Sequence, residues 1–113
     1  MRQRLLPWLL VAFFLFGGVV NLIGPDPIVA DFLRWGYPRW FHLPTGLMEL
    51  VAAALLAFKR TRITGVVTGA VVMMGAALTL LVHGEWLHMI APVAVLAILA
   101  LIVRDPPKAA KES

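Results

Sequence analysis

Residues 63–82 read ITGVVTGAVVMMGAALTLLV and decide the fold. The segment carries no charge and directly follows the basic stretch of Lys59, Arg60 and Arg62. A hydrocarbon core about 30 Å thick needs about 20 apolar residues of helix, so the segment predicts a membrane span. The whole chain of 113 residues is 61% hydrophobic and only 14% charged, against about 25% charged residues in a typical soluble domain. The composition therefore predicts an integral membrane protein and excludes a disordered chain.

Three further segments, at residues 5–23, 43–58 and 87–103, approach the same length. The first is uncharged and follows Arg2 and Arg4; since no small-x-small cleavage site follows it, we expect a retained helix rather than a signal peptide. The segment at 43–58 contains a glutamate, and a buried or re-entrant segment is the alternative there. We expect an all-α, integral membrane four-helix bundle over residues 1–104 and a short disordered cytoplasmic tail over residues 105–113.

The basic residues divide unequally between the two sides of a four-span topology. With the N-terminus inside, the loops around Trp35 and Gly84 lie outside and contain only Arg34 and Arg39. The other side collects the remaining cations: Arg2, Arg4, Lys59, Arg60, Arg62, Arg104, Lys108 and Lys111. The positive-inside rule then predicts that both termini are cytoplasmic and that the protein is a multi-pass component of a plasma (inner) membrane.

Several functions are disfavoured by what the chain contains. Its net charge of +4 lies in short clusters beside apolar runs, so we expect the lipid bilayer, and not nucleic acid, as its surroundings. The chain has no cysteine, and the spacing of His83 and His88 does not fit the HExxH zinc motif. Glu85 and His88 resemble half of a di-iron pair, but a second pair is missing. We therefore expect no metal site and no stand-alone enzyme.

Helical periodicity assigns faces to two of the spans. In residues 61–83 the small and polar side predicts a helix–helix interface, because small residues permit close backbone approach in membranes. That side holds Thr61, Gly65, Thr68, Val72, Gly75, Ala76, Thr79 and His83, and the side expected to face lipid holds Ile63, Val66, Val67, Met74, Leu78 and Leu81. In the span at 43–58, Glu49 shares a face with Gly46, Ala52 and Ala53, opposite Leu47 and Val51. Glu49 is therefore expected to point into the bundle.

Glu49 is the most informative single residue. A charged carboxylate at this depth costs on the order of 2.5–3.5 kcal/mol on insertion scales, so a compensating interaction is required. One interpretation is a proton-accepting or ligand-binding carboxylate. The other is a structural glutamate that bonds to Arg34, Arg39 or a neighbouring hydroxyl group and locks the bundle. The sequence leaves both open.

Polar groups from several spans lie at a similar depth, near the loop at residues 31–41. If the helices bundle, these groups converge and form a candidate pocket in the outer leaflet. The candidate ligand-binding residues are Glu49, Asn21, His83, Thr79, His88 and Arg34.

Four strings resemble the DoxX-like family of small bacterial membrane proteins, in order and spacing, over about residues 8–103. They are FGGVVNLIG at residues 16–24, WGYPRWF at 35–41, TGLMEL at 45–50 and MGAALT at 74–79. The resemblance implies a four-helix membrane bundle and, through the family name, kinship with a subunit of a thiosulfate:quinone oxidoreductase. Glu49 falls on the family's glutamate of the second span. Asn21 departs from the family pattern, which has a lysine there in many members, so a charged partner for Glu49 is lost.

Three functions follow as hypotheses. The leading one is a DoxX-like protein that binds a small apolar or quinone-like molecule in the pocket, as a membrane component of a redox system with a membrane or redox protein partner. The second is a proton-coupled exporter of the small multidrug type, which also has four spans and a buried glutamate. In those exporters, however, the essential acid lies in the first span and the charge bias is weak. The third is a structural or assembly protein without a ligand.

Overall fold

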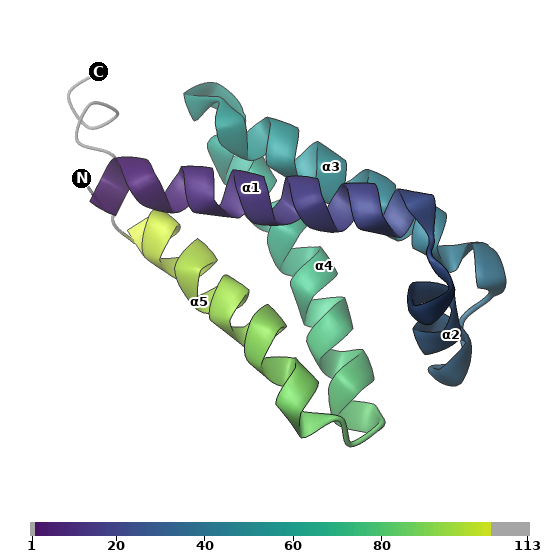
Figure 1. Ribbon diagram of the computed structural model, residues 1–113. Coiled ribbons are helices and arrows are strands. Elements are labelled where there is room, and N and C mark those ends of the chain that lie inside the picture. The colour runs from purple at the N-terminus through teal and green to yellow at the C-terminus, as the bar shows by residue number, and fades with distance from the viewer. Residues whose placement is uncertain (1, 105–113) are drawn as a thin grey trace.

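The computed structural model describes residues 2–104, with side chains from Leu5 onward, and all its regular elements are helical. The helices α1 (Arg2–Ile23), α3 (His42–Ala57), α4 (Arg62–Val82) and α5 (Ile90–Arg104) form the bundle. A shorter helix, α2 (Asp26–Arg34), covers one end (Figure 1). The 3-10 turns η1 (Arg39–Phe41), η2 (Lys59–Thr61) and η3 (Trp86–Met89) precede α3, α4 and α5. The tail expected at residues 105–113 lies outside the described residues.

Four helical segments are long and apolar enough to cross a membrane. They are Leu5–Ile23, Arg39–Ala57, Lys59–Val82 and Trp86–Arg104. Each overlaps one of the four spans predicted from the sequence, so the prediction of four helices of spanning length is confirmed. The last span differs in detail, because residues 86–89 form the 3-10 turn η3 and the α-helix begins only at Ile90.

Helix α2 is not among the helices that the sequence predicts, because its nine residues are too few to span a membrane. Pro25 and Pro27 define its start, where a missing amide N–H costs no helical hydrogen bond. Asp26 in the first turn and Arg34 in the last turn complement the helix dipole. Val29 and Phe32, three residues apart, are buried. Helix α2 is therefore a short amphipathic helix that packs across the ends of the longer ones, at what we call the α2 end of the bundle.

Helices α1 and α3 cross at very short range. A Cβ atom added to Gly46 would lie 2.8 Å from the carbonyl oxygen of Gly18 and 2.9 Å from the backbone nitrogen of Leu22. A Cβ atom added to Gly18 would in turn lie 2.9 Å from the carbonyl oxygen of Gly46. Only glycine fits at such a backbone-to-backbone contact, as is common at membrane helix interfaces.

The half of the bundle near η2 is tightly packed. Phe14 of α1 is fully buried, and its ring fills the space above Gly69 of α4, where an added Cβ atom would lie 2.8 Å from the ring. Leu56 and Leu99 complete this layer from α3 and α5. The core cluster comprises Leu10, Phe14, Ala52, Ala53, Leu56, Val66, Met73, Val95, Leu99 and Ile102.

The turn between α3 and α4 is held by side chains that cap the end of α3. Thr61 Oγ1 donates a hydrogen bond to the carbonyl oxygen of Leu55 at 2.7 Å, and Arg62 Nε donates one to that of Leu56 at 2.9 Å. These contacts satisfy carbonyl groups that lack a partner at a helix C-terminus.

The predicted helix faces are confirmed for α3 and corrected for α4. In α3, Gly46, Glu49, Ala52 and Ala53 are buried, as expected. In α4, Val66 is buried although it was expected to face lipid, and Gly75 is exposed although it was expected at an interface. The buried side of α4 follows Arg62, Gly65, Val66, Gly69, Met73 and Leu80. The Phe14 ring packs on Gly69, within the buried stripe, whereas Gly75 borders the cavity and has nothing within 4 Å of an added Cβ atom.

The Gly46→Ala variant should be less stable than the wild type, because its methyl group would meet backbone atoms of α1. Overpacking of this kind costs about 1–3 kcal/mol. Thermal unfolding in mild detergent, followed by circular dichroism, should show a lower Tm. The matched control is Gly75→Ala, since nothing lies within 4 Å of an added Cβ atom there. Equal Tm values for the two variants would contradict the close crossing.

Candidate functional site

A cavity of about 520 Å³ lies between α2 and the halves of α1, α3 and α4 that lead to it. Its volume falls within the range of about 300–1,000 Å³ that is typical of small-molecule sites. The lining is mostly apolar, with polar groups at a few positions. The lining residues are Asn21, Ile28, Asp31, Phe32, Trp35, Tyr37, Phe41, Pro44, Thr45, Met48, Glu49, Val71, Val72, Met73, Gly75, Ala76, Thr79 and Leu80.

Glu49 and Asn21 form a polar pair on one wall of the cavity. Glu49 is 5% exposed, and its Oε1 atom accepts a hydrogen bond from the Asn21 side-chain amide. Its Oε2 atom lies over Gly17, where an added Cβ atom would be 2.8 Å away. The close crossing of α1 and α3 thus places the carboxylate against the backbone of α1. The pair presents both hydrogen-bond acceptors and an amide donor at the cavity.

A cluster of aromatic rings covers the cavity from the α2 end. Phe32 contacts Trp35, Tyr37 and Phe41 edge-on, with ring centroids 5.7, 6.1 and 5.8 Å apart. Tyr37 and Phe41 stack with centroids 4.6 Å apart and ring planes 6° apart. We call α2 and the segment up to Phe41 the cap. Its aromatic rings give the cavity a largely apolar roof.

The cap is tied to α4 through a pair of hydroxyl groups. The oxygen atoms of Tyr37 and Thr79 lie 2.6 Å apart, and Thr79 also donates to the carbonyl oxygen of Gly75 at 2.8 Å. Because the Thr79 proton is used in the second bond, Tyr37 is the donor in the first. Both side chains line the cavity, so this pair forms a second polar point on the wall formed by α4.

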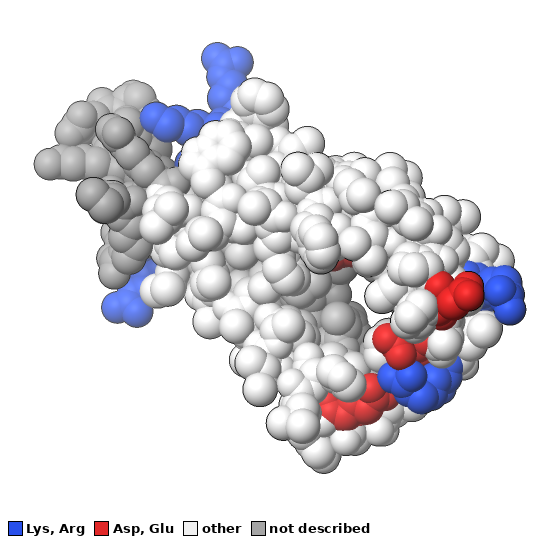
Figure 2. Space-filling view, viewed as in Figure 1, with Lys and Arg blue, Asp and Glu red and all other residues white. Residues whose placement is uncertain are grey.

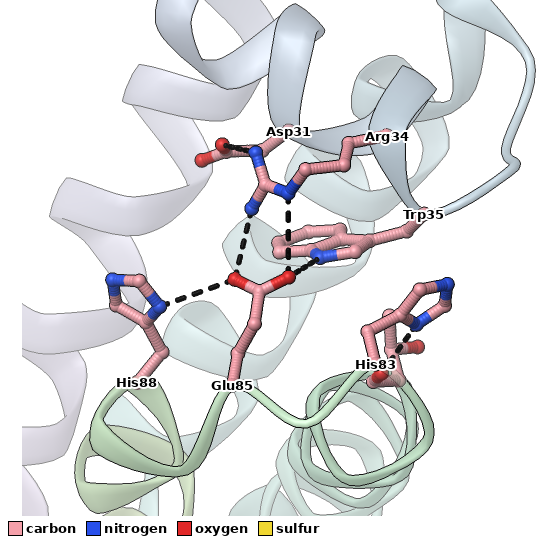
Figure 3. Close-up of polar contacts among 7 residues, drawn as sticks. Asp31, Arg34, Trp35, His83, Glu85 and His88 are labelled. Atoms are coloured by element: carbon pink, nitrogen blue, oxygen red, sulfur yellow. Dashed lines mark hydrogen bonds and ion pairs between the residues drawn. The ribbon is translucent and has the colours of Figure 1, made fainter.

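A cluster of charged groups, which we call the clasp, joins the cap to the turn between α4 and α5 (Figure 3). Arg34 binds Glu85 with both prongs of its guanidinium group: Nη2 lies 2.9 Å from Oε1, and Nε lies 3.3 Å from Oε2. Trp35 Nε1 donates to Glu85 Oε2 at 2.7 Å, and Asp31 Oδ1 accepts from Arg34 Nη1 at 2.6 Å. His88 Nδ1 lies 3.2 Å from Glu85 Oε1.

Two glycines place the residues that fasten the cap. Gly36 ends α2 with φ = 89° and Gly84 ends α4 with φ = 69°, a region that favours glycine. After Gly36, the Tyr37 N–H donates to the carbonyl oxygen of Phe32; after Gly84, the Glu85 N–H donates to that of Leu80. Both ends are Schellman motifs. The residue after each glycine makes a contact between the cap and the α4 side of the bundle: Tyr37 bonds to Thr79, and Glu85 bonds to Arg34.

The clasp stays ionised over a wide range of pH. Hydrogen bonds from Arg34 and Trp35 lower the pKa of Glu85 to about 2. The hydrogen bonds of Arg34 to Glu85 and Asp31 raise the pKa of Arg34 above its ordinary value. At neutral pH the two groups therefore carry opposite charges, and His88 adds a further hydrogen bond to Glu85.

The structure brings together some of the residues singled out in the sequence and separates others. Asn21, Glu49 and Thr79 line the cavity. Arg34 and His88 lie in the clasp, outside the lining, and Arg34 bonds to Glu85 and Asp31 rather than to Glu49. His83 is exposed, its Nδ1 atom bonds to the carbonyl oxygen of Thr79, and its ring points away from the clasp (Figure 3). Among the described residues, no group of three His, Asp or Glu side chains is arranged to hold a metal ion.

A scan against models of protein families matches the DoxX-like family over residues 5–102, which is most of the chain. The protein belongs to the DoxX-like family. This DoxX-like protein is accordingly a membrane protein with a bundle of transmembrane helices. No curated protein and no solved structure matches the chain.

Several residues of the DoxX-like cavity were not singled out by sequence reasoning, chiefly Phe32, Trp35 and Tyr37 of the cap. The signal was present: prolines open α2, Gly36 closes it, and apolar residues recur between them. Length alone predicts a loop here, because nine residues are too few to span a bilayer.

The cap should stay closed from pH 8 to about pH 5 and loosen at lower pH. Because the folded pKa of Glu85 is depressed, its stabilising contribution is complete above its unfolded pKa of about 4.3 and is lost as the pH falls towards 2. Trp35 fluorescence reports this in a protein whose other tryptophans are replaced by Phe. We expect the emission maximum of Trp35 to shift to longer wavelength below about pH 4 when the clasp is wild type. In the Glu85→Gln variant we expect the shifted emission at every pH.

The control for this experiment is Arg39→Gln, an exposed cation of η1 that takes part in none of the ion pairs found among the described residues. It should follow the wild-type curve. A Glu85→Gln emission that coincides with the wild type at pH 7 would show that the clasp does not hold the cap.

Proposed function

We propose that this DoxX-like protein binds a small, flat, apolar molecule of the quinone type in its cavity, as a membrane component of a redox system. In this proposal the electrons are exchanged with a partner protein, and the chain is not an enzyme by itself. The observation that carries the proposal is the Asn21–Glu49 pair on the wall of an aromatic-roofed cavity within membrane-spanning helices. An intramembrane carboxylate at such a place is by default a functional group.

The polar groups fit both redox forms of a quinone. A quinone carbonyl oxygen accepts a hydrogen bond from the second N–H of the Asn21 amide, whose first N–H is bonded to Glu49. A quinol hydroxyl group donates to a carboxylate oxygen of Glu49. The Tyr37–Thr79 pair supplies hydroxyl groups from the cap and α4. The Asn21–Glu49 pair and the Tyr37–Thr79 pair lie on two walls of the cavity, and the rest of the lining is mostly apolar. This arrangement suits an apolar ring with oxygen atoms on two sides.

We also propose that the α2 end faces the outside of a bacterial inner membrane, with both termini in the cytoplasm. The charge distribution supports this orientation, since eight of the ten lysines and arginines fall on the side of the termini and η2. Among the described residues, Figure 2 shows basic side chains at the end near the termini and a mixture of acidic and basic side chains at the opposite end. The cavity would then open in the outer half of the membrane.

The Glu49→Gln variant should bind decylubiquinol about 10- to 100-fold more weakly than the wild type. A hydrogen bond to a charged group contributes about 1.5–3 kcal/mol, whereas the isosteric glutamine keeps the bond from Asn21. Quenching of Trp35 fluorescence gives the Kd in detergent. Asp26→Asn, which changes an exposed acid outside the cavity lining, should bind like the wild type. Absorbance and mass spectrometry of lipid-soluble molecules retained after mild purification should show a quinone in the wild type.

Other outcomes of these experiments favour the other functions. If the wild type and Glu49→Gln both retain lipid alone and neither binds the quinol, Glu49 is a structural lock and the protein has no ligand of this class. Dye efflux from proteoliposomes driven by a pH gradient, lost in Glu49→Gln, would instead establish the proton-coupled exporter.

The proposed orientation can be measured by thiol labelling, because the natural chain has no cysteine. Ala30→Cys on α2 and Arg60→Cys on η2 each place one thiol at an exposed position. In intact spheroplasts, a membrane-impermeant maleimide should label Ala30→Cys and leave Arg60→Cys unlabelled until the membrane is opened. The reverse pattern would contradict the orientation.

A further inference from the structure

The wall of the cavity is incomplete on the flank of the bundle. Four lining residues are also exposed on the outside of the protein: Pro44 and Met48 of α3, and Val71 and Gly75 of α4. Met48 is 41% exposed and Val71 is 56% exposed. Each pair is spaced four residues apart, so each forms a stripe along one side of its helix. The two stripes border an opening between α3 and α4.

The fold explains why the opening lies there. Helices α3 and α4 meet at η2 and diverge towards the α2 end (Figure 1). The packed core fills the narrow part near η2, and the space between the diverging halves is left hollow. Figure 2, viewed from the side on which α1 crosses in front of α3, shows that the bundle is hollowed between its long helices and the charged α2 end. Small side chains on α4, including Gly75 and Ala76, do not fill this space.

The opening lies at a depth that belongs to the bilayer. Gly75 and Val71 precede the end of α4 at Val82 by seven and eleven residues, or about 10 and 16 Å of helix rise. Glu49 lies seven residues after the start of α3 at His42, also about 10 Å along its helix. The carboxylate and the opening therefore both lie about two helical turns or more inside the ends of their spans, a position that faces lipid chains when these helices cross a bilayer.

Access to the cavity from water, at the α2 end, is more restricted than access through the opening between α3 and α4. The cap lies over the α2 end of the cavity, and it is fastened by the Tyr37–Thr79 contact and by the two-pronged bond between Arg34 and Glu85. The pKa of Glu85, about 2, keeps the clasp ionised at all physiological pH values. A molecule in water meets a fastened cap, whereas a molecule in the bilayer meets an open flank.

We propose that the cavity is loaded sideways from the bilayer, through the opening between α3 and α4, while the cap stays fastened. The occupant is then a membrane-dissolved amphipathic molecule with a flat apolar body and a hydrogen-bonding end that reaches Asn21 and Glu49. Gly75 acts as a specificity-determining position, because its missing side chain sets the width of the opening. This inference rests on the proposed function and adds the route of entry and the class of ligand.

The first test asks where the probe comes from. Protein with Trp35 as its only tryptophan is placed in liposomes and mixed with decylubiquinone, and the rate of quenching is measured at several lipid concentrations. Loading from the bilayer predicts that the rate follows the mole fraction of probe in the membrane. A rate that follows the free aqueous concentration instead would overturn the proposal.

The second test narrows the opening. Nothing lies within 4 Å of an added Cβ atom at Gly75, so Gly75→Leu should fold normally. We expect the rates of quinone entry and exit both to fall at least tenfold, with the Kd changed less than the rates. The control is Ala54→Leu, which introduces the same leucine side chain at an exposed position of α3 outside the cavity lining, and should behave like the wild type. Equal rates in the two variants would refute the opening.

The third test releases the cap. Glu85→Gln removes the ionic clasp, and we expect the loading rate to change less than twofold. An increase of tenfold or more would show that entry passes under the cap from water.

If the wild type shows no quenching at equilibrium, the proposed function itself fails. If the wild type shows normal quenching at equilibrium and the rates of quinone entry and exit are unaltered in Gly75→Leu, the proposed route of entry is wrong and the proposed function stands. Retained phospholipid that decylubiquinone does not displace would contradict the ligand class.

Discussion

The close crossing of α1 and α3 is the contact on which the rest of the structure depends. Gly18 and Gly46 bring the two backbones together, and this approach places Asn21 within reach of Glu49 and the Glu49 carboxylate over Gly17. In a medium without water, the carboxylate needs a partner from the protein. The partner is a neutral amide, so the pair leaves acceptor and donor capacity at the cavity wall.

The two halves of the bundle have different tasks. Near η2, Phe14 and its neighbours fill the interior, and Thr61 and Arg62 cap the end of α3. Towards the α2 end the helices diverge, and α2 covers the end of the cavity between them. The Schellman motifs at Gly36 and Gly84 couple this closure to the helix ends, because the residue after each glycine is the one that makes the fastening contact.

The sequence was enough to predict the four long helices and the inward direction of Glu49, because length, hydropathy and the 3.6-residue period are local properties. It did not predict α2, whose nine residues have local helix signals at both ends but are too few to span a bilayer and pack through Val29 and Phe32. The pairing of Arg34 with Glu85 depends on residues 51 positions apart and on the geometry of two turns. The sequence pattern placed Val66 towards lipid, whereas Val66 belongs to the core cluster that also contains Phe14. Such long-range contacts follow from packing, which a single sequence does not display.

The separation of a filled half from a hollow half also bears on how such a protein changes over evolutionary time. Substitutions in the Phe14 layer disturb the contacts that hold all four long helices together. Substitutions at Met48, Val71 or Gly75 meet open space or lipid, so they reshape the hollow with little effect on folding. A lineage built on this plan is therefore free to exchange one membrane-soluble occupant for another by changing a few wall residues, while the same scaffold is inherited intact.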